Sequence, residues 1–263
     1  MLIAQITDCH VRPEGKLVYG AIDSAPMLER AVAKLNGLHP LPDLVLATGD
    51  LVDAGQEAEY RRLRAILGRL RMRLLLLPGN HDRRAPLRAA FPDHPYLDGP
   101  DGSCCYAEES GPIRLVALDS MEEGKIGGVF DAKRLAWLDR TLAARPDAPT
   151  LVFTHHPPFI TGIAHMDEYG TVGGDDLAAV IARHPQVVRV IAGHVHRSMS
   201  VAWAGTLCTT CPSTAHQFAL DLAPGMPAFW TDEPPGFQLH HWLPATGLIT
   251  HTATTDPNAR HAL

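Results

Sequence analysis

A chain of 263 residues and 28.5 kDa, with 46% hydrophobic and 20% charged residues, excludes a disordered or fibrous protein and is long enough for one large domain. A formal net charge of −6 argues against a general nucleic-acid-binding surface, so we expect no nucleic-acid polymer as a partner. No apolar run approaches the ~18 residues that a membrane span requires.

Hydrophobic periodicity and turn residues predict alternating strands and helices. In the first half of the chain we expect strands at 2–6, 44–47, 74–77 and 113–118, helices at 24–38 and 60–70, and a loop at 93–112. In the second half we expect helices at 131–142 and 175–183, strands at 150–154 and 187–192, and a hairpin at 201–210. An irregular excursion at 212–236, a closing hairpin at 237–252 and a frayed end at 255–263 should follow. This order is typical of one α/β domain. We assign 1–210 to its core and 211–263 to a C-terminal cap or lid segment with the closing hairpin of the same domain.

Polar side chains follow five of the predicted strands. The segments are Asp8-Cys9-His10, Gly49-Asp50, Gly79-Asn80-His81-Asp82, His155-His156 and Gly193-His194-Val195-His196. Short Asp-x-His or His-x-His patterns arise by chance in a chain with 15 histidines, but the tetrapeptide Gly-Asn-His-Asp is expected only on the order of 0.001 times. Because sites of open α/β sheets lie beyond the carboxyl ends of the strands, we expect these five loops to converge.

The converging residue types point to a metal site. Carboxylate, imidazole and amide donors suit divalent Mn, Fe or Zn, and none of them requires a thiolate. Asp50 lies in the middle of the series and is the natural carboxylate to bridge two ions. Two ions about 3.5–4 Å apart hold a bridging hydroxide and clamp phosphate oxygens for in-line attack. We also expect the glycines at 49, 79 and 193 to allow sharp turns beside the ions.

The ordered series resembles the signature of the calcineurin-like metallophosphoesterases over residues 2–196. The stretches TGDLVDAG, LPGNHD and FTHHPPF, with the opening MLIAQITDCHVRPEGKLVYG, are most similar to those of bacterial class III cyclic-nucleotide phosphodiesterases and the glycerophosphodiesterases grouped with them. The resemblance implies a four-layer α/β/β/α sandwich with two mixed sheets, here with a C-terminal lid or dimerisation excursion.

The resemblance also implies the site. One metal ion would take Asp8, His10, Asp50 and His196, and the second would take Asp50, Asn80, His155 and His194. His81 would contact the phosphate or protonate the leaving oxygen. We interpret Asp82 as a partner of His81 in catalysis or as the N-cap of the next helix.

Substrate choice is expected to depend on the loops around the metals. Arg12, Tyr19, His165 and His216 lie in such loops and are candidate substrate contacts. The stretches 156–175 and 212–236 contain no Lys or Arg, which favours a diester over a monoester dianion. We therefore expect hydrolysis of small phosphodiesters, either cyclic nucleotides or glycerophosphodiesters. The alternatives are a phosphomonoesterase or nucleotide pyrophosphohydrolase with the same metals, and a non-catalytic scaffold with this fold.

Other residues have plainer interpretations. We expect His156 to orient His155, Cys9 to lie in the core, and the spacing of Cys208 and Cys211 to be coincidental. The histidines at 240, 241, 251 and 261 are expected at the surface. Aromatic residues within 218–243 fit either an interface in a homodimer or higher homo-oligomer, or a small core under a long loop. Five scattered cysteines fit a reducing compartment, so we expect a cytoplasmic protein.

Overall fold

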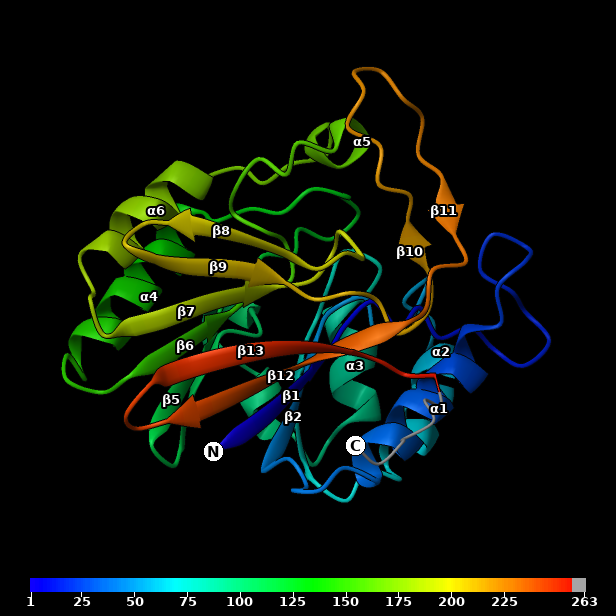
Figure 1. Ribbon diagram of the computed structural model, residues 1–263, viewed down its shortest axis with the longest axis horizontal. Coiled ribbons are helices and arrows are strands. Elements are labelled where there is room, and N and C mark those ends of the chain that lie inside the picture. The colour runs from blue at the N-terminus through cyan, green and yellow to red at the C-terminus, as the bar shows by residue number, and fades with distance from the viewer. Residues whose placement is uncertain (257–263) are drawn as a thin grey trace, which may run out of the picture.

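Two mixed β-sheets face each other in the computed structural model, which describes residues 1–256 (Figure 1). The five-stranded sheet has the order β13 (Gly247–Thr254), β12 (Gly236–Leu243), β1 (Leu2–Ile6), β2 (Leu44–Thr48), β3 (Arg73–Leu77). The six-stranded sheet has the order β4 (Tyr106–Ser110), β5 (Ile113–Ala117), β6 (Thr150–Phe153), β7 (Val187–Ala192), β9 (Thr206–Thr210), β8 (Met199–Trp203). In the first sheet β1, β2 and β3 run parallel, and β12 pairs antiparallel with β1.

Alternation of side chains along the strands fills three apolar layers. Between the sheets, Ile3, Leu46 and Leu75 pack against residues of β5 and β6, including Leu115 and Phe153. The opposite faces of the same strands pack on helices. The helices are α1 (Ser24–Asn36), α2 (Glu57–Leu67) and α3 (Arg84–Ala90) on the first sheet, and α4 (Ala132–Ala143) and α6 (Gly174–Ala182) on the second. This arrangement confirms the four-layer α/β/β/α sandwich that the sequence predicts.

The C-terminal hairpin belongs to the core sheet because β12 pairs directly with β1. Between β9 and β12 the chain forms a small two-stranded ribbon of β10 (Gln217–Phe218) and β11 (Trp230–Thr231). The segment joining these two strands projects from the sandwich close to the short helix α5 (Ala164–Asp167), as Figure 1 shows. No helix in the described part of the chain is long and apolar enough to cross a membrane.

Three local expectations are wrong. The expected loop at 93–112 contains two short 3-10 turns (Pro95–Leu97 and Pro100–Gly102) and strand β4, which pairs with β5 at the edge of the second sheet. His240 is fully buried, because it lies between the sheets and bonds to the side chains of Gln5 and Thr250. Thr255 is also buried, and its backbone N–H donates to the Pro235 carbonyl. Residues 257–263, including His261, lie outside the described residues.

Candidate metal centre

The seven predicted metal ligands come together at one end of the two sheets. Each follows a strand: β1, β2, β3, β6 or β7. Five of them have backbone φ angles in the left-handed region, namely Asp8 (52°), His10 (44°), Asp50 (47°), His194 (70°) and His196 (50°). Non-glycine residues rarely adopt this conformation, and strained backbone of this kind is concentrated at functional sites. The turns that aim these side chains are therefore held in place by the surrounding fold.

The first group of donors comprises Asp8, His10 and His196. The Nε2 atoms of His10 and His196 are 3.2 Å apart, and His196 Nε2 is 3.3 Å from Asp8 Oδ1. On the far side of each ring, His196 Nδ1 donates to the His216 carbonyl and His10 Nδ1 donates to Asp53 Oδ1. Backbone carbonyls and carboxylates at the second ring nitrogen are the usual supports of metal-binding histidines.

The second group comprises Asn80, His155 and His194. Asn80 Oδ1 is 3.1 Å from both His155 Nε2 and His194 Nδ1. His155 Nδ1 donates to the Thr48 carbonyl, and His194 Nε2 is buried without a hydrogen-bond partner among the described residues. Asp50 lies between the two groups, with Oδ1 3.3 Å from His155 Nε2 and Oδ2 3.8 Å from His10 Nε2.

The donor atoms fit divalent cations. Because Nδ1 of His10, His155 and His196 each donates outward, the Nε2 atom of each neutral ring carries a lone pair that points inward. In the described part of the chain, these lone pairs face the lone pairs of other ring nitrogens and the side-chain oxygens of Asp8, Asp50 and Asn80. A convergence of lone pairs is unfavourable unless a cation or a proton lies among them.

The pKa values of two groups in the site show how strongly their charges interact. Burial lowers the pKa of His155, but the Asp50 carboxylate outweighs burial and raises it to about 9. Burial likewise disfavours the charged form of Asp50, yet the neighbouring histidines, with His155 first, hold its pKa well below the usual range. The buried Asp50 carboxylate therefore favours a positive charge beside it, whether from a proton on His155 or from a bound cation.

Glycines make room for these ligands. A Cβ atom at Gly49 would lie 2.6 Å from His155 Cγ, and one at Gly79 would lie 2.7 Å from His155 Nε2. At Gly193 it would lie 2.9 Å from Asp8 Oδ2. Only Gly49 of the three has a positive φ, at 101°. Tight turns nevertheless begin at the other two, since the Gly79 carbonyl accepts from Asp82 N–H at 3.1 Å and the Gly193 carbonyl accepts from Val195 N–H at 2.8 Å. All three glycines thus start turns and also admit the ligand side chains.

His81 borders the centre, and its partner is Asp53, which the sequence analysis did not identify. His81 Nδ1 donates to the Asp53 carbonyl oxygen at 2.7 Å, so Nε2 is left for the pocket. The Asp53 carboxylate accepts from His10 and, at 2.9 Å, from Arg12. Although burial opposes it, the carboxylate of Asp50 and the contacts with Asp53 raise the pKa of His81. The sequence signal that could have identified Asp53 is that an acidic residue follows Asp50 by three positions.

Asp82 does not contact the His81 ring through any hydrogen bond of the described chain. It is fully buried and accepts from the backbone N–H groups of Leu51 and Gly79 and from the Tyr60 hydroxyl. Burial first and the Asp50 carboxylate second raise its pKa to about 7. Arg83, not Asp82, precedes α3 as its N-cap residue. Asp82 therefore ties together the two loops that carry Asp50 and Asn80.

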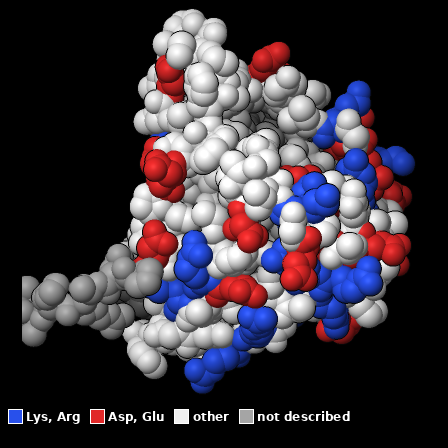
Figure 2. All heavy atoms as spheres, turned by 90° about the vertical axis from the view of Figure 1, so that its right-hand side faces the viewer, with Lys and Arg blue, Asp and Glu red and all other residues white. Residues whose placement is uncertain are grey.

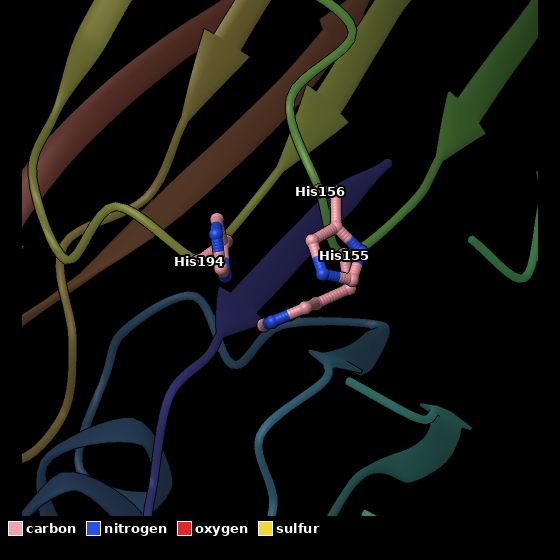
Figure 3. A group of neighbouring side chains, drawn as sticks. All are labelled: His155, His156 and His194. Atoms are coloured by element: carbon pink, nitrogen blue, oxygen red, sulfur yellow. The ribbon is translucent and has the colours of Figure 1, made fainter. Parts of the chain in front are cut away.

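His156 is held on both ring nitrogens. Its Nδ1 accepts from the Ser120 hydroxyl at 2.8 Å, and its Nε2 donates to the Ile126 carbonyl at 3.0 Å. Figure 3 shows the His156 ring beside His155 on the segment after β6, with His194 on the segment after β7. Burial first and His155 second lower the pKa of His156 to about 3, so the ring is neutral. His156 thus contacts the 120–126 loop and has no free nitrogen for a metal.

The four candidate substrate contacts differ in position. Tyr19 and His165 line a pocket of about 360 Å³ above the donor groups. His216 is buried against the rings of His10, His196 and Tyr19, with both ring nitrogens unpartnered among the described residues. Arg12 does not line the pocket, because its guanidinium is paired with Asp53 and Glu59. Cys9, Cys208 and Cys211 are buried free thiols.

Comparison with known proteins agrees with this geometry. The model of the calcineurin-like phosphoesterase family matches residues 1–198. A probable glycerophosphodiester phosphodiesterase of Arcobacter nitrofigilis is 36% identical over 254 residues, covering 96% of this chain and 93% of the relative. A probable cyclic nucleotide phosphodiesterase of Rhodopseudomonas palustris is 34% identical over 254 residues, covering 95% and 91%.

Among solved structures, a dimetal phosphatase from Danio rerio has the same fold, with a TM-score of 0.67 at 16% identity over 97% of this chain and 99% of that one. The family match, the two long relatives and the series of strand-end ligands all agree. The chain belongs to the calcineurin-like phosphoesterase family.

Proposed function

We propose that this protein hydrolyses small phosphodiesters with two divalent metal ions, Mn, Fe or Zn. The observation that carries the proposal is the inward convergence of imidazole nitrogens with carboxylate and amide oxygens at the floor of a pocket. When bound, the two ions would supply an activated water nucleophile and a clamp for the phosphate oxygens.

The ligand sets follow from the two donor groups. Asp8, His10, Asp50 and His196 would hold one ion, and Asp50, Asn80, His155 and His194 would hold the other. Asp50 is suited to bridge them, since one of its carboxylate oxygens faces each group. The outward hydrogen bonds of the three histidines fix the tautomer in which Nε2 is free to bind.

His81 would act on the substrate directly. Its ring is packed edge-on against His10 at 4.7 Å, and its Nδ1 is anchored to the Asp53 carbonyl. The remaining ring nitrogen can contact a phosphate oxygen or donate a proton to the leaving oxygen. The charges around His81 that favour its protonated form support this role.

The pocket favours a diester over a more highly charged phosphate. Among the residues that the structure describes, no Lys or Arg side chain lines it. A monoester dianion or a pyrophosphate would bring additional negative charge to a site with no Lys or Arg side chain among the described residues to receive it. A diester carries a single charge, which the two ions can neutralise. The similarity to glycerophosphodiester and cyclic nucleotide phosphodiesterases supports the same substrate class.

The first test compares bis(p-nitrophenyl) phosphate with p-nitrophenyl phosphate, using chelator-treated protein with and without added Mn. We expect hydrolysis that requires metal and prefers the diester. His155→Ala should lose both bound metal and activity, whereas His251→Ala, at an exposed histidine of β13, should retain both. Preference for the monoester would overturn the diester assignment, and absence of metal binding would overturn the enzyme assignment.

We further propose a homodimer or higher homo-oligomer, formed through the excursion between β10 and β11. Its large apolar side chains are strongly exposed, with Leu222 at 63% and Phe229 at 55%. Light scattering of the wild type and of a Leu222→Asp, Phe229→Asp variant tests this. If the wild type is a monomer, the oligomer proposal is wrong and the excursion would instead be a lid over the pocket. In that case the double variant should have a changed KM and an unchanged mass by light scattering.

We also propose a cytoplasmic location, because all five cysteines are free and buried, a state that a reducing compartment preserves. Fractionation of cells that produce the protein is the test.

A further inference from the structure

The pocket above the metal centre has two unlike faces. Its floor is formed by the donor groups, and facing them are five largely apolar residues that we call the apolar wall: Ile126, Met166, Tyr169, Phe218 and Ala228. Ile126 and Tyr169 are exposed at 50% and 45%, so a group bound beside them would cover apolar surface. A pocket of about 360 Å³ is larger than a phosphate group requires and is within the usual range for small ligands.

The apolar wall is fixed to the metal centre through His156. The His156 ring lies next to the candidate ligand His155 (Figure 3). It donates to the Ile126 carbonyl and so sets the position of that residue. The 120–130 and 156–174 loops are joined to each other by hydrogen bonds from Phe130 N–H to the Val172 carbonyl and from Val172 N–H to the Gly128 carbonyl, both at 2.9 Å. The wall is therefore preorganised beside the floor.

Phe218 continues the wall, because it packs against the small cluster that contains Met166. Its ring lies 4.5 Å from the ring of His196 and 5.5 Å from that of His165. Figure 2 shows the projecting upper part of this face almost without blue Lys or Arg groups, which are gathered lower on the molecule. The described stretch 212–236 that forms this part contains no Lys or Arg.

The charge of the lining restricts what this wall can accept. Asp50 is the one carboxylate within residues 1–256 that lines the pocket, and it belongs to the floor. An anionic group against the wall would lose its hydration without gaining an ion pair, which is costly. An apolar or aromatic group would instead remove Ile126 and Tyr169 from water, and that burial is favourable.

We propose that the apolar wall is the subsite for an ester substituent of the diester, and that it selects uncharged apolar or aromatic substituents over small polar or anionic ones. This inference rests on the proposed function, because it assumes that the phosphate is bound at the floor. It names the substrate class more narrowly: diesters with at least one bulky uncharged arm.

The test uses three diesters that differ only in their substituents: dimethyl phosphate, diphenyl phosphate and bis(4-carboxyphenyl) phosphate. Each is titrated into the Mn-loaded protein by calorimetry, and each is measured as an inhibitor of bis(p-nitrophenyl) phosphate hydrolysis. We expect diphenyl phosphate to bind at least about tenfold more tightly than dimethyl phosphate. The carboxylated ester, which has the same rings, should bind at least about tenfold more weakly than diphenyl phosphate.

Variants of Ile126 connect this selectivity to the wall. Because only its carbonyl makes the tether to His156 and its side chain is half exposed, substitutions there should not disturb folding. Ile126→Asp should remove most of the preference for diphenyl over dimethyl phosphate, and Ile126→Lys should improve binding of the carboxylated ester. Ile160→Asp is the matched control, since Ile160 is 79% exposed and does not line the pocket.

Equal affinities of dimethyl and diphenyl phosphate in the wild type, or an unchanged preference in Ile126→Asp, would overturn the proposal. Calorimetry separates this outcome from failure of the proposed function. A protein that binds diphenyl phosphate selectively but hydrolyses no diester would retain the subsite and lose the catalytic assignment. A protein that hydrolyses diesters without selectivity would retain catalysis and lose the subsite.

Discussion

Removing the carboxylate of Asp53 should weaken metal binding without unfolding the protein. Asp53 Oδ1 accepts from His10 Nδ1 at 3.3 Å, and Oδ2 accepts from Arg12 at 2.9 Å. In Asp53→Ala the His10 ring, whose side chain is 3% exposed, would lose its acceptor and its fixed tautomer. Arg12 would keep Glu59 at 3.3 Å, so the loop should stay folded.

The magnitude follows from the geometry. Loss of such a supporting carboxylate typically costs roughly 10- to 100-fold in metal affinity, or about 1.4–2.7 kcal/mol. The 3.3 Å contact is long and the Asp53 side chain is 18% exposed, so we expect the lower part of this range, about 10- to 30-fold. Asp53→Asn, which retains an acceptor oxygen, should be affected less than Asp53→Ala.

Calorimetric titration of chelator-treated protein with Mn measures this effect, and thermal unfolding without metal serves as the folding check. The matched control is Asp139→Ala, which removes another carboxylate bonded to a histidine, His184 at 2.8 Å, away from the pocket. The reasoning is refuted if Asp53→Ala binds Mn within about twofold of the wild type, or if Asp139→Ala weakens binding equally.

Three further predictions concern the same centre. Because the pKa of His155 is raised to about 9, its proton must leave when metal binds. Mn affinity should therefore rise by up to about tenfold per pH unit between pH 7 and 9, with proton release visible in buffers of different ionisation enthalpy; a flat profile contradicts this. Gly79→Ala should reduce activity by about 100-fold through its clashes with Asp50 and His155, whereas Gly37→Ala, where a Cβ meets nothing closer than 3.5 Å, should not; equal activities would refute the steric argument. His81→Ala should lower kcat by roughly 10²- to 10⁴-fold with little change in melting temperature, and near-full activity would exclude its role.

Local patterns along the chain were sufficient for the sheet strands of the core and for the strand-end segments that carry the candidate metal ligands, whereas the division of these residues into ligand sets came from the family resemblance. Each predicted ligand follows an apolar strand directly, and parallel strands bring their carboxyl ends to one edge of a sheet. Side-chain alternation also made Cys9 a core residue between Asp8 and His10, as the structure confirms. These features depend on neighbours within a few residues, so they can be read from the sequence.

Other features depended on contacts between distant segments. His240 looked like a surface residue but is buried, because Gln5, 235 positions away, supplies its hydrogen-bond partner. Strand β4 was missed because an edge strand with charged residues lacks the pattern of a buried strand.

Sequence alone therefore determined which residue types face the metal centre and in what order they occur. Tertiary structure decided which groups support them, such as Asp53 for both His10 and His81, and which do not, such as Asp82. It also brought together the residues of the apolar wall, which come from segments around 126, 166–169 and 218–228. The physical reason is that hydrogen-bond partners and pocket walls are set by distances across the fold, which no local periodicity encodes.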